Sequence, residues 1–319
     1  MDIDEFNNFP PVASNYFNYM LTIKGKSYNT VKAYSYDLEL FFKFLKKQKY
    51  DIKETEFNEI PINDIDIDFI KQINLNDLYS FLSYVSNKRH NGSNARARKV
   101  ACLKSFFNFI CNKIKVIDYN PAIELESPKI GQRNPVYLDL DESKKLLGSI
   151  SGQFFERDYA IITLFLNTGL RLSELVNIDI SSIKKDTLRV TGKGNKERTV
   201  YLNKACIVAV KNYLAVRPTD DIIDRDALFL SKRKKRISPK TIQYIVKKYI
   251  KAAGLDTNKY STHKLRHTAA TLMYKYGKVD IRTLQSILGH SSVATTQIYT
   301  HVDEDILRKA VNKNPLSDI

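Results

Sequence analysis

A proline-dense stretch near the middle of the chain sets the strongest limit on its fold. The segment "DYNPAIELESPKIGQRNPVYL" contains Gly131 and the prolines Pro121, Pro128 and Pro135. Each proline lacks a backbone N–H and restricts the residue before it, so no continuous helix can cross this segment. We therefore expect domains at residues 1–117 and 136–319, joined by a linker at 118–135. A chain of 319 residues is long enough for two domains.

Helical periodicity dominates the part before the linker. Apolar residues recur on one helical face at about 12–23, 29–48, 75–87 and 93–113. Ser93 is the expected N-cap of the fourth helix. The acidic stretch "NDIDIDFIKQINLND" favours a local insertion or loop. We therefore expect a helical N-terminal domain.

The part after the linker is mixed. "DLDESKKLLGSI" predicts a helix capped by Asp141, and "RDYAIITLFLNTGLRLSELVNI" predicts two helical segments that separate at Thr168-Gly169. In "DTLRVTGKGNKERTVYLN", β-branched residues flank a Gly-Lys-Gly turn, as in a hairpin. Further helices are expected at 204–214, 239–253, 262–276, 281–288, 293–300 and 302–311. The fold class is therefore mainly α with a small β-sheet.

Composition excludes several classes of protein. The chain has no run of eighteen apolar residues, and its acidic start lacks the apolar core of a signal peptide. We expect neither a membrane span nor secretion, and hence a cytoplasmic protein. Cys102, Cys111 and Cys206 form no CxxC pair, which disfavours a zinc ribbon or a disulfide framework. A net charge of +16 indicates either an anionic partner or a basic surface.

Two groups of cations stand out. Arg96, Arg98 and Lys99 occupy the first turns of the helix expected at 93–113, where cations oppose the helix dipole. A phosphate backbone would offset this cost, and a solvated basic face is the alternative. The second group lies in "SKRKKRISPKT" and consists of Lys232, Arg233, Lys235 and Arg236.

In "STHKLRHTAATL", two histidines and an arginine share one helical face, because His263, Arg266 and His267 stand at i, i+3 and i+4. The spacing of the histidines is that of zinc proteases, but Lys264 replaces the glutamate base and Arg266 would repel a dication. "TGKGNKERT" lacks the P-loop pattern, and no GxSxG sequence occurs. Zinc catalysis, ATP binding and serine hydrolysis are therefore not supported.

Phosphate chemistry without a metal remains. Arg171 follows a glycine turn in "NTGLRLSEL", and Glu174 one turn later can orient it or simply pair with it. Arginine binds two phosphoryl oxygens in a planar fork, so Arg171 and Arg266 could replace Mg²⁺ at a pentacoordinate phosphate. Tyr299 is a candidate nucleophile, although most of the nineteen tyrosines must serve in packing or at the surface. No cofactor is expected.

Four motifs occur in an order that identifies a family. "TGLRLSEL", "TGKGNKER", "HKLRHTAAT" and "LGHSSVATTQIYTH" resemble those of the tyrosine site-specific recombinases, the phage-integrase family, and are most similar to its Xer branch. The resemblance covers nearly the whole chain. It implies a helical core-binding domain, a linker and an α+β catalytic domain, which together close on duplex DNA like a clamp.

The resemblance also implies how the phosphate is bound and how the leaving group departs. Arg171 and Arg266 would bind the nonbridging oxygens of the scissile phosphate. His290 would donate a hydrogen bond to the same phosphate. Lys193, in the hairpin turn, would protonate the departing 5′ oxygen.

The remaining roles concern the nucleophile. Tyr299 would attack in line and give a 3′-phosphotyrosyl enzyme with a free 5′ hydroxyl. His263 would assist proton transfer to or from the tyrosine. Glu174 matches a supporting acidic residue of the family, and His267 is expected to be structural. No position of the catalytic set is missing.

Partners follow from the same resemblance. The expected partner is duplex DNA with a specific recombination site, bound by a tetramer on two sites, either of this chain alone or with a paralogous recombinase. A DNA translocase is a candidate regulator. Both cation groups become expected phosphate contacts. The segment after Tyr299, with an apolar stripe at Ile306, Leu307, Ala310 and Val311, would dock in a neighbouring protomer or fold back on its own domain.

The expected function is resolution of chromosome or plasmid dimers, in chromosome segregation and cell division. A mobile-element integrase with the same chemistry is one alternative. A type IB topoisomerase-like enzyme is another, and it would act without site preference. A DNA-binding architectural protein would leave the catalytic set unexplained.

Overall fold

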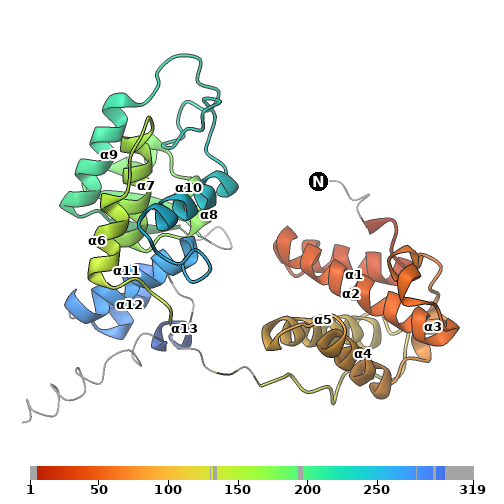
Figure 1. The fold of residues 1–319 in the computed structure, drawn as a ribbon. Coiled ribbons are helices and arrows are strands. Elements are labelled where there is room, and N and C mark those ends of the chain that lie inside the picture. The colour runs from red at the N-terminus through yellow and green to blue at the C-terminus, as the bar shows by residue number, and fades with distance from the viewer. Residues whose placement is uncertain are drawn as a thin grey trace, which may run out of the picture. The chain divides into compact units, whose positions relative to one another are not determined.

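The structure is a computed structural model that describes residues 6–129, 131, 135–192, 197–277, 279–289 and 292–298. The chain forms two compact units, Met1–Gln132 (unit 1) and Arg133–Ile319 (unit 2), and each is described by itself (Figure 1). The division lies inside the predicted linker at 118–135. Ile117, Ala122 and Leu125 are buried in the core of unit 1, so the first part of that linker packs on the helices before it.

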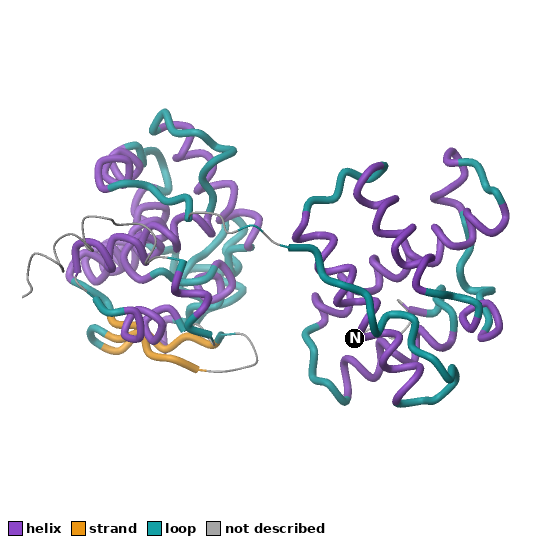
Figure 2. The backbone as a smooth tube through the Cα atoms, turned by 90° about the horizontal axis from the view of Figure 1, so that it is seen from below, coloured by secondary structure: helices purple, strands orange, loops and turns teal. Residues whose placement is uncertain are grey.

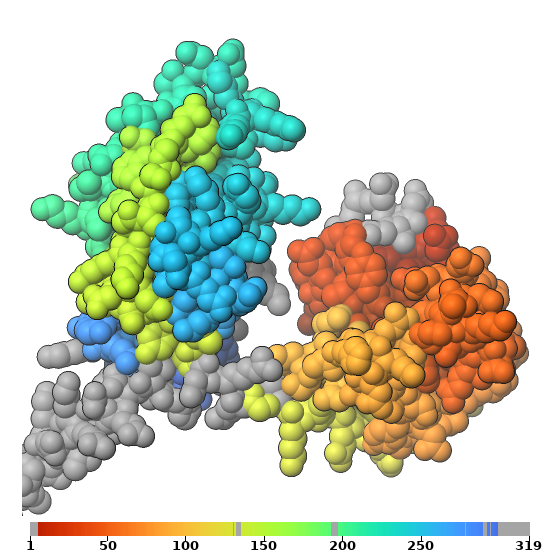
Figure 3. All heavy atoms as spheres, in the orientation of Figure 1, coloured from red at the N-terminus to blue at the C-terminus, as the bar shows by residue number. Residues whose placement is uncertain are grey.

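Unit 1 is helical, as predicted. Its elements are α1 (Pro11–Thr22), α2 (Tyr28–Tyr50), the 3₁₀ helix η2 (Glu54–Glu59), α3 (Ile67–Lys71), α4 (Leu75–Asn87) and α5 (Ser93–Asn112). The core is rich in aromatic rings: the Tyr16 and Phe106 centroids lie 5.5 Å apart, edge to face, and Phe41 and Phe81 pack in the same way at 5.1 Å. In the space-filling view, the red and orange atoms of unit 1 form one closely packed surface (Figure 3).

The acidic stretch in unit 1 is not simply a loop. It contains α3, which Asp66 caps by accepting a hydrogen bond of 2.7 Å from the Phe69 N–H. Ile65, Ile70 and Ile73 are buried in the core of unit 1. Asp64, Asp66 and Asp68 are exposed, so the segment presents charge to water while its buried isoleucines pack against their neighbours.

Two predicted helix caps are each displaced by one or two residues. The N-cap of α5 is Gly92, which makes no side-chain bond, and Ser93 is the first helical residue. The N-cap of α6 (Leu140–Gly148) is Asp139 rather than Asp141. Asp139 accepts from the Glu142 N–H at 2.7 Å, and Glu142 accepts from the Asp139 N–H at 3.0 Å. This reciprocal capping box explains the choice, since Asp141 has no such partner three residues later.

Unit 2 combines helices with one small sheet, which confirms the predicted fold class. Its other helices are α7 (Phe155–Thr168), α8 (Leu172–Val176), η3 (Ile180–Ser182), α9 (Lys204–Val216), α10 (Pro239–Ala252), α11 (Thr262–Gly277), α12 (Ile281–Leu288) and α13 (Ala294–Gln297). The predicted helix at 302–311, with its apolar stripe, lies outside the described residues. Among the described residues, no helix is both long and apolar enough to cross a bilayer.

The sheet lies at one side of unit 2 (Figure 2). It is antiparallel, in the order β1 (Ile183–Lys184), β2 (Thr187–Thr191), β3 (Glu197–Tyr201). The pairing of β2 with β3 confirms the predicted hairpin, whereas β1 was not predicted. Val190 faces Arg198 in the register, and Val200 two residues on is buried. Because side chains alternate along a strand, Arg198 shares its face with Val200 and is directed toward the core.

A glycine turn brings the helices of unit 2 together. Gly169 ends α7 with a φ of 63°, a left-handed conformation that glycine adopts at little cost. A Cβ at this position would lie 2.8 Å from Leu288 Cδ2 and 3.6 Å from Ala269 Cβ. The turn therefore packs directly against α11 and α12, and it places the start of α8 beside them.

The net charge is divided unequally between the two units. Residues 1–132 contain 18 basic and 16 acidic residues, and residues 133–319 contain 33 and 19, so the net charges are +2 and +14. The net positive charge that attracts an anion at long range therefore lies mostly on unit 2.

Candidate active site

The side chain of Glu174, on α8, has no exposed surface and is held by arginines. Its Oε2 accepts from the Arg171 backbone N–H at 2.7 Å and from Arg198 Nη2 at 2.9 Å. Its Oε1 accepts from Arg171 Nη1 at 2.8 Å, and Arg266 Nη1 lies 3.9 Å from Oε2. Burial raises the pKa of Glu174, but the Arg171 N–H and the Arg198 guanidinium lower it more, so the pKa lies below its ordinary value of 4.5. Glu174 is therefore an anion at neutral pH.

The same three arginines bind three successive carbonyls at the end of α12. Arg198 Nη1 donates to Ile287 O, Arg266 Nη2 donates to Leu288 O at 2.7 Å, and Arg171 Nη2 donates to Gly289 O at 2.8 Å. The last carbonyls of a helix lack partners within the helix and carry partial negative charge. We call Arg171, Arg198 and Arg266 the arginine cluster. It joins α8, β3 and α11 to the end of α12.

The charge of this cluster suits a phosphate. Three guanidinium groups surround one carboxylate, which leaves two positive charges in excess. Arg266 is 4% exposed and Arg171 is 33% exposed, so the cations are partly withdrawn from water. Their attraction for an anion is correspondingly stronger than that of surface lysines.

His263 lies on the same helix as Arg266, as predicted. Its Nε2 is 3.1 Å from Nε2 of His267, and the two rings meet edge to face, so one ring donates and the other accepts. Burial lowers the pKa of His263 below 6.5, and the positive charges of Lys264, Arg266 and Arg171 lower it further. A neutral imidazole at pH 7 is the form that can accept a proton.

Half of the predicted catalytic set can be placed. Arg171, His263 and Arg266 are described, while Lys193, His290 and Tyr299 lie outside the described residues. The structure brings Arg171 and Arg266 together around Glu174, although 95 positions separate the two arginines in the sequence. The assigned roles of all six residues remain predictions.

Sequence reasoning missed Arg198. This residue stands at the end of the quoted motif "TGKGNKER", where it was read only as part of a polar hairpin. Strand alternation could have indicated it, because an arginine on the same face as Val200 must find an anionic or carbonyl partner inside.

The side chains of the first group of predicted DNA contacts, Arg96, Arg98 and Lys99, bind partners within unit 1. Lys99 is buried and donates to Asp37 Oδ1 at 2.6 Å, and Arg98 binds the other oxygen of the same carboxylate. Arg96 donates to Ser86 Oγ at 2.6 Å. Asp37 on α2 therefore offsets the cost of placing cations at the start of α5, so a phosphate is not needed to explain them. The burial of Lys99 also removes its ammonium from the surface.

The second group lines a basic cavity of about 540 Å³ in unit 2. Lys232, Arg233 and Lys235 are exposed there. Arg236 differs, because it donates to Asp179 at 2.6 Å and to Asp224 at 2.9 Å. The lining also includes the cations Arg157 and Lys248. Three of the four predicted residues are therefore available to an anion, and the fourth is bound to carboxylates.

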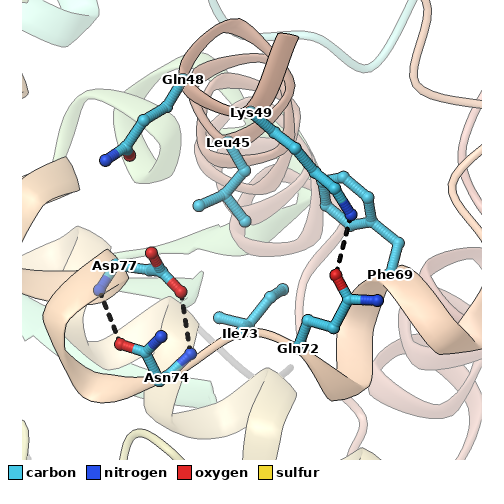
Figure 4. Close-up of a pocket in the computed structure, with 8 residues that line it drawn as sticks. All are labelled: Leu45, Gln48, Lys49, Phe69, Gln72, Ile73, Asn74 and Asp77. Carbon is cyan, nitrogen blue, oxygen red and sulfur yellow. Dashed lines mark hydrogen bonds between the residues drawn. The ribbon is translucent and has the colours of Figure 1, made fainter.

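A cavity of about 300 Å³ in unit 1 has a different character (Figure 4). Lys49 donates to Gln72 Oε1 at 2.8 Å, and Asn74 and Asp77 cap each other at the start of α4. No predicted catalytic residue lines it, and these polar groups already bind one another. In the described part of the chain, no three His, Cys, Asp or Glu side chains are grouped to hold a metal ion.

Comparison with known proteins decides the family. The phage integrase family matches residues 137–305, which include the arginine cluster. The chain belongs to this family, the tyrosine recombinases. The recombinase is 63% identical to tyrosine recombinase XerC of Caldanaerobacter subterraneus subsp. tengcongensis, over 97% of this chain and 88% of that protein. It is 32% identical to tyrosine recombinase XerC of Leptospira interrogans, over 94% of this chain and 92% of that protein.

A solved structure shares the fold. The XerH site-specific recombinase bound to its difH substrate, in a pre-cleavage complex, matches the recombinase with a TM-score of 0.68. The two are 23% identical, and the match covers 94% of this chain and 84% of that one. These comparisons confirm the predicted family, fold class and enzyme class of the recombinase.

Proposed function

We propose that the recombinase cuts and rejoins duplex DNA at a specific recombination site, and that it resolves chromosome or plasmid dimers. The observation that carries this proposal is the arginine cluster, whose excess positive charge surrounds a buried carboxylate and needs no metal to bind a phosphate. The high identity to a protein named XerC supports the housekeeping role rather than a mobile-element role.

The proposed chemistry exchanges one phosphodiester for another. Tyr299 attacks the scissile phosphorus, a P–O bond forms to the tyrosine, and the P–O5′ bond breaks. His263 takes up the proton of the Tyr299 phenol, a group with an ordinary pKa of about 10. Lys193 delivers a proton to the departing 5′ oxygen. The covalent intermediate retains the energy of the diester, so the reverse attack by a 5′ hydroxyl rejoins DNA without ATP.

Arg171, Arg266 and His290 would bind the phosphate during this exchange. Arg171 and Arg266 reach the nonbridging oxygens, and Glu174 keeps Arg171 in place. Each arginine supplies a rigid fork of donors that matches a phosphoryl group. The developing negative charge is thus neutralised by groups that are already oriented.

DNA binding is proposed for both parts of the chain. Residues 1–117 would form the core-binding domain and residues 136–319 the catalytic domain. Lys232, Arg233 and Lys235 are the proposed phosphate contacts in unit 2, with Arg96 and Arg98 in unit 1. The DNA complex of XerH supports this partner. The proposed assembly is a tetramer on two sites, of this chain or with a paralogous recombinase, under control of a DNA translocase in the cytoplasm of a dividing cell.

Covalent trapping in EDTA tests the proposed function. Host DNA fragments with random nicks are incubated with the wild-type recombinase or with Tyr299→Phe. A nick near the cleavage point lets the short 5′-hydroxyl piece diffuse away, so the linked complex accumulates. We expect a denaturation-resistant complex for the wild type only, and sequencing of the attached DNA gives the site.

Site preference is the second part of this test. A plasmid with two copies of the recovered sequence in direct orientation should be converted into two circles. Relaxation of a plasmid that lacks the sequence, at the same rate as one that carries it, would contradict a site-specific enzyme. DNA binding without any covalent complex would contradict the proposed chemistry.

A further inference from the structure

We propose that Arg198 is a positioning residue of the recombination reaction. It holds the Glu174 carboxylate and the end of α12 in the places from which they orient Arg171 and Arg266. This inference rests on the proposed function, in which those two arginines bind the scissile phosphate. Arg198 itself is not assigned a contact with the DNA.

The guanidinium of Arg198 is fixed at both ends. Nη2 donates to Glu174 Oε2 at 2.9 Å, and Nη1 donates to Ile287 O. The side chain is 14% exposed, and its Nε has no hydrogen-bond partner among the described residues. The side chain passes beside Gly289, where a Cβ would lie 2.7 Å from Arg198 Cδ. Arg198 is thus a rigid connection from β3 to both α8 and α12.

Without Arg198, Glu174 would still accept two hydrogen bonds from Arg171. The loss of Arg198 should therefore displace the carboxylate rather than only unfold the chain. Arg171 still supplies a backbone N–H at 2.7 Å and a guanidinium N–H at 2.8 Å. Glu174 therefore stays partnered, but Oε2 loses its one guanidinium donor within 3 Å among the described residues. The carboxylate would then turn toward Arg266 Nη1 and draw it away from Gly169 O, to which it donates, since a buried carboxylate recovers lost hydrogen bonds where it can.

Arginine is required at this position rather than any cation. A planar guanidinium can bind a carboxylate and a carbonyl on different elements at once, with fixed angles between its N–H groups. The ammonium of a lysine is a compact charge that would serve only one of the two. A lysine at 198 should therefore keep the positive charge but lose the simultaneous bonds to the carboxylate and the carbonyl.

The chain offers a matched control on the neighbouring strand. Arg189 of β2 is 66% exposed and lies 3.8 Å from Glu197, which is 58% exposed. A surface ion pair of this kind contributes little to stability. Arg189→Ala removes the same side chain from the same sheet without touching Glu174 or α12.

The test uses the full-length recombinase and a nicked duplex of the sequence recovered by covalent trapping. The single-turnover rate of covalent complex formation is measured at saturating protein, together with the Kd for the duplex and the Tm. We expect Arg198→Ala to slow the reaction on the order of 100-fold, the effect of a displacement of about 1 Å in the reacting groups. Arg198→Lys should lose a smaller factor, and Arg189→Ala should match the wild type. The Kd of Arg198→Ala should stay close to that of Arg189→Ala.

A double variant separates positioning from a general loss of structure. If Arg198 acts through Glu174, Arg198→Ala combined with Glu174→Gln should be little slower than the slower single variant. Rates that multiply, or an Arg198→Ala rate equal to that of Arg189→Ala, would overturn the inference. Should Arg198→Ala fail to fold, Arg198→Lys carries the test, and an unchanged rate in that variant has the same meaning. A wild-type recombinase that forms no covalent complex would instead refute the proposed function.

Discussion

At the scale of single residues, Glu174 determines most of the candidate site. Its carboxylate accepts from Arg171 and Arg198 and lies 3.9 Å from Arg266, so one anion orders three cations. Removal of one partner from such a buried set leaves the others with unbalanced charge, which costs several kcal/mol. The site is therefore sensitive to substitutions that keep shape but change charge.

Glu174→Gln should destabilise the recombinase by about 3 kcal/mol at neutral pH, because the arginines lose their counter-ion. The folded-state pKa of Glu174 lies below 4.5, so its stabilisation is complete above pH 4.5 and is lost as the pH falls through the folded-state pKa. The difference in Tm between wild type and Glu174→Gln should thus be constant from about pH 5 to pH 7 and shrink in acid. A difference that grows in acid would contradict the lowered pKa.

His263 should titrate below pH 6.5, since burial and the charges of Lys264, Arg266 and Arg171 all disfavour its cation. The measurement is the NMR shift of its ring Cε1–H against pH, with the signal identified by its loss in His263→Gln. Lys264→Ala should raise the midpoint toward 6.5, because one of the repelling charges is removed. A midpoint above 6.5 in the wild type would contradict this assignment of causes.

Residue-level prediction from the sequence succeeded where partners are close in the chain. The contact of Arg171 with Glu174 follows from an i, i+3 spacing that any helix start would bring together. The partners of Arg198 and Lys99 are far away in the sequence, at Glu174 and Asp37. No local pattern indicates which distant carboxylate a cation meets, so the role of Lys99 was misassigned and that of Arg198 was missed.

At the scale of elements, the contact of α2 with α5 depends on a buried ion pair. Asp37 is 3% exposed, and it binds Lys99 at 2.6 Å and also Arg98. Asp37→Ala should destabilise unit 1 by about 3–5 kcal/mol, since it leaves the Lys99 ammonium buried without its counter-ion. Chemical denaturation of the full chain, monitored by a probe in unit 1, measures this.

Glu39→Ala on the same helix is the control for Asp37→Ala. Glu39 binds Lys43 at 2.8 Å in an i, i+4 pair and is 36% exposed, so its loss should cost about 0.5 kcal/mol or less. A further change, Lys99→Met in the Asp37→Ala background, should recover much of the lost stability. Equal losses in the free energy of unfolding for Asp37→Ala and Glu39→Ala would show that the buried ion pair stabilises unit 1 no more than an exposed one.

The turn after α12 makes a second prediction at this scale. Gly289 has a φ of 64°, and a Cβ there would meet Arg198 Cδ at 2.7 Å. Gly254 also has a positive φ, of 69°, but nothing lies within 4 Å of its Cβ position. Gly254→Ala should cost about 1–2 kcal/mol from the backbone alone, and Gly289→Ala should cost more. In an Arg198→Ala background the two should become equal in Tm, and a persistent difference would point to another obstacle.

Elements were predicted well wherever apolar residues follow the helical period. The predicted helix at 75–87 and that at 281–288 have the bounds of α4 and α12. Two short elements, α3 and β1, were missed, because five and two residues are too few to show a period. The helix α8 also has five residues, but the glycine turn before it indicated where it begins. The cap of α6 was misplaced because two acidic residues compete there, and only the reciprocal bond of Asp139 with Glu142 settles which one caps.

At the scale of the whole molecule, the unequal division of charge predicts how the chain responds to salt. With a net charge of +14 on residues 133–319, affinity for a random-sequence duplex should fall linearly on a log–log plot against salt. Arg233→Ala should reduce the slope by about 0.9, the value for one lost phosphate contact. Arg236→Ala should leave the slope unchanged, because its guanidinium binds Asp179 and Asp224. Equal effects of the two substitutions would contradict this distinction.

The prolines predict a break in the chain at 118–135, but no local pattern predicts how the arginine cluster assembles. Helix-breaking residues act locally, and the boundary between units does fall among them. The arginine cluster draws on α8, β3 and α11 and closes on the end of α12. Periodicity indicates which face of each element is apolar. It does not indicate how the faces of these four elements pack together. The four motifs still indicated the family, because they occur in the order that is typical of its members.

The close passage of Arg198 beside Gly289 also constrains how this chain can diverge. While arginine stands at 198, a side chain at 289 requires the Arg198 side chain to move from its bonds to Glu174 and Ile287 O. Once a lineage shortens residue 198, only the backbone cost of the positive φ still opposes a side chain at 289, and a later return to arginine would meet that side chain. Among descendants of such a chain, a change at 289 should therefore follow a change at 198 rather than precede it.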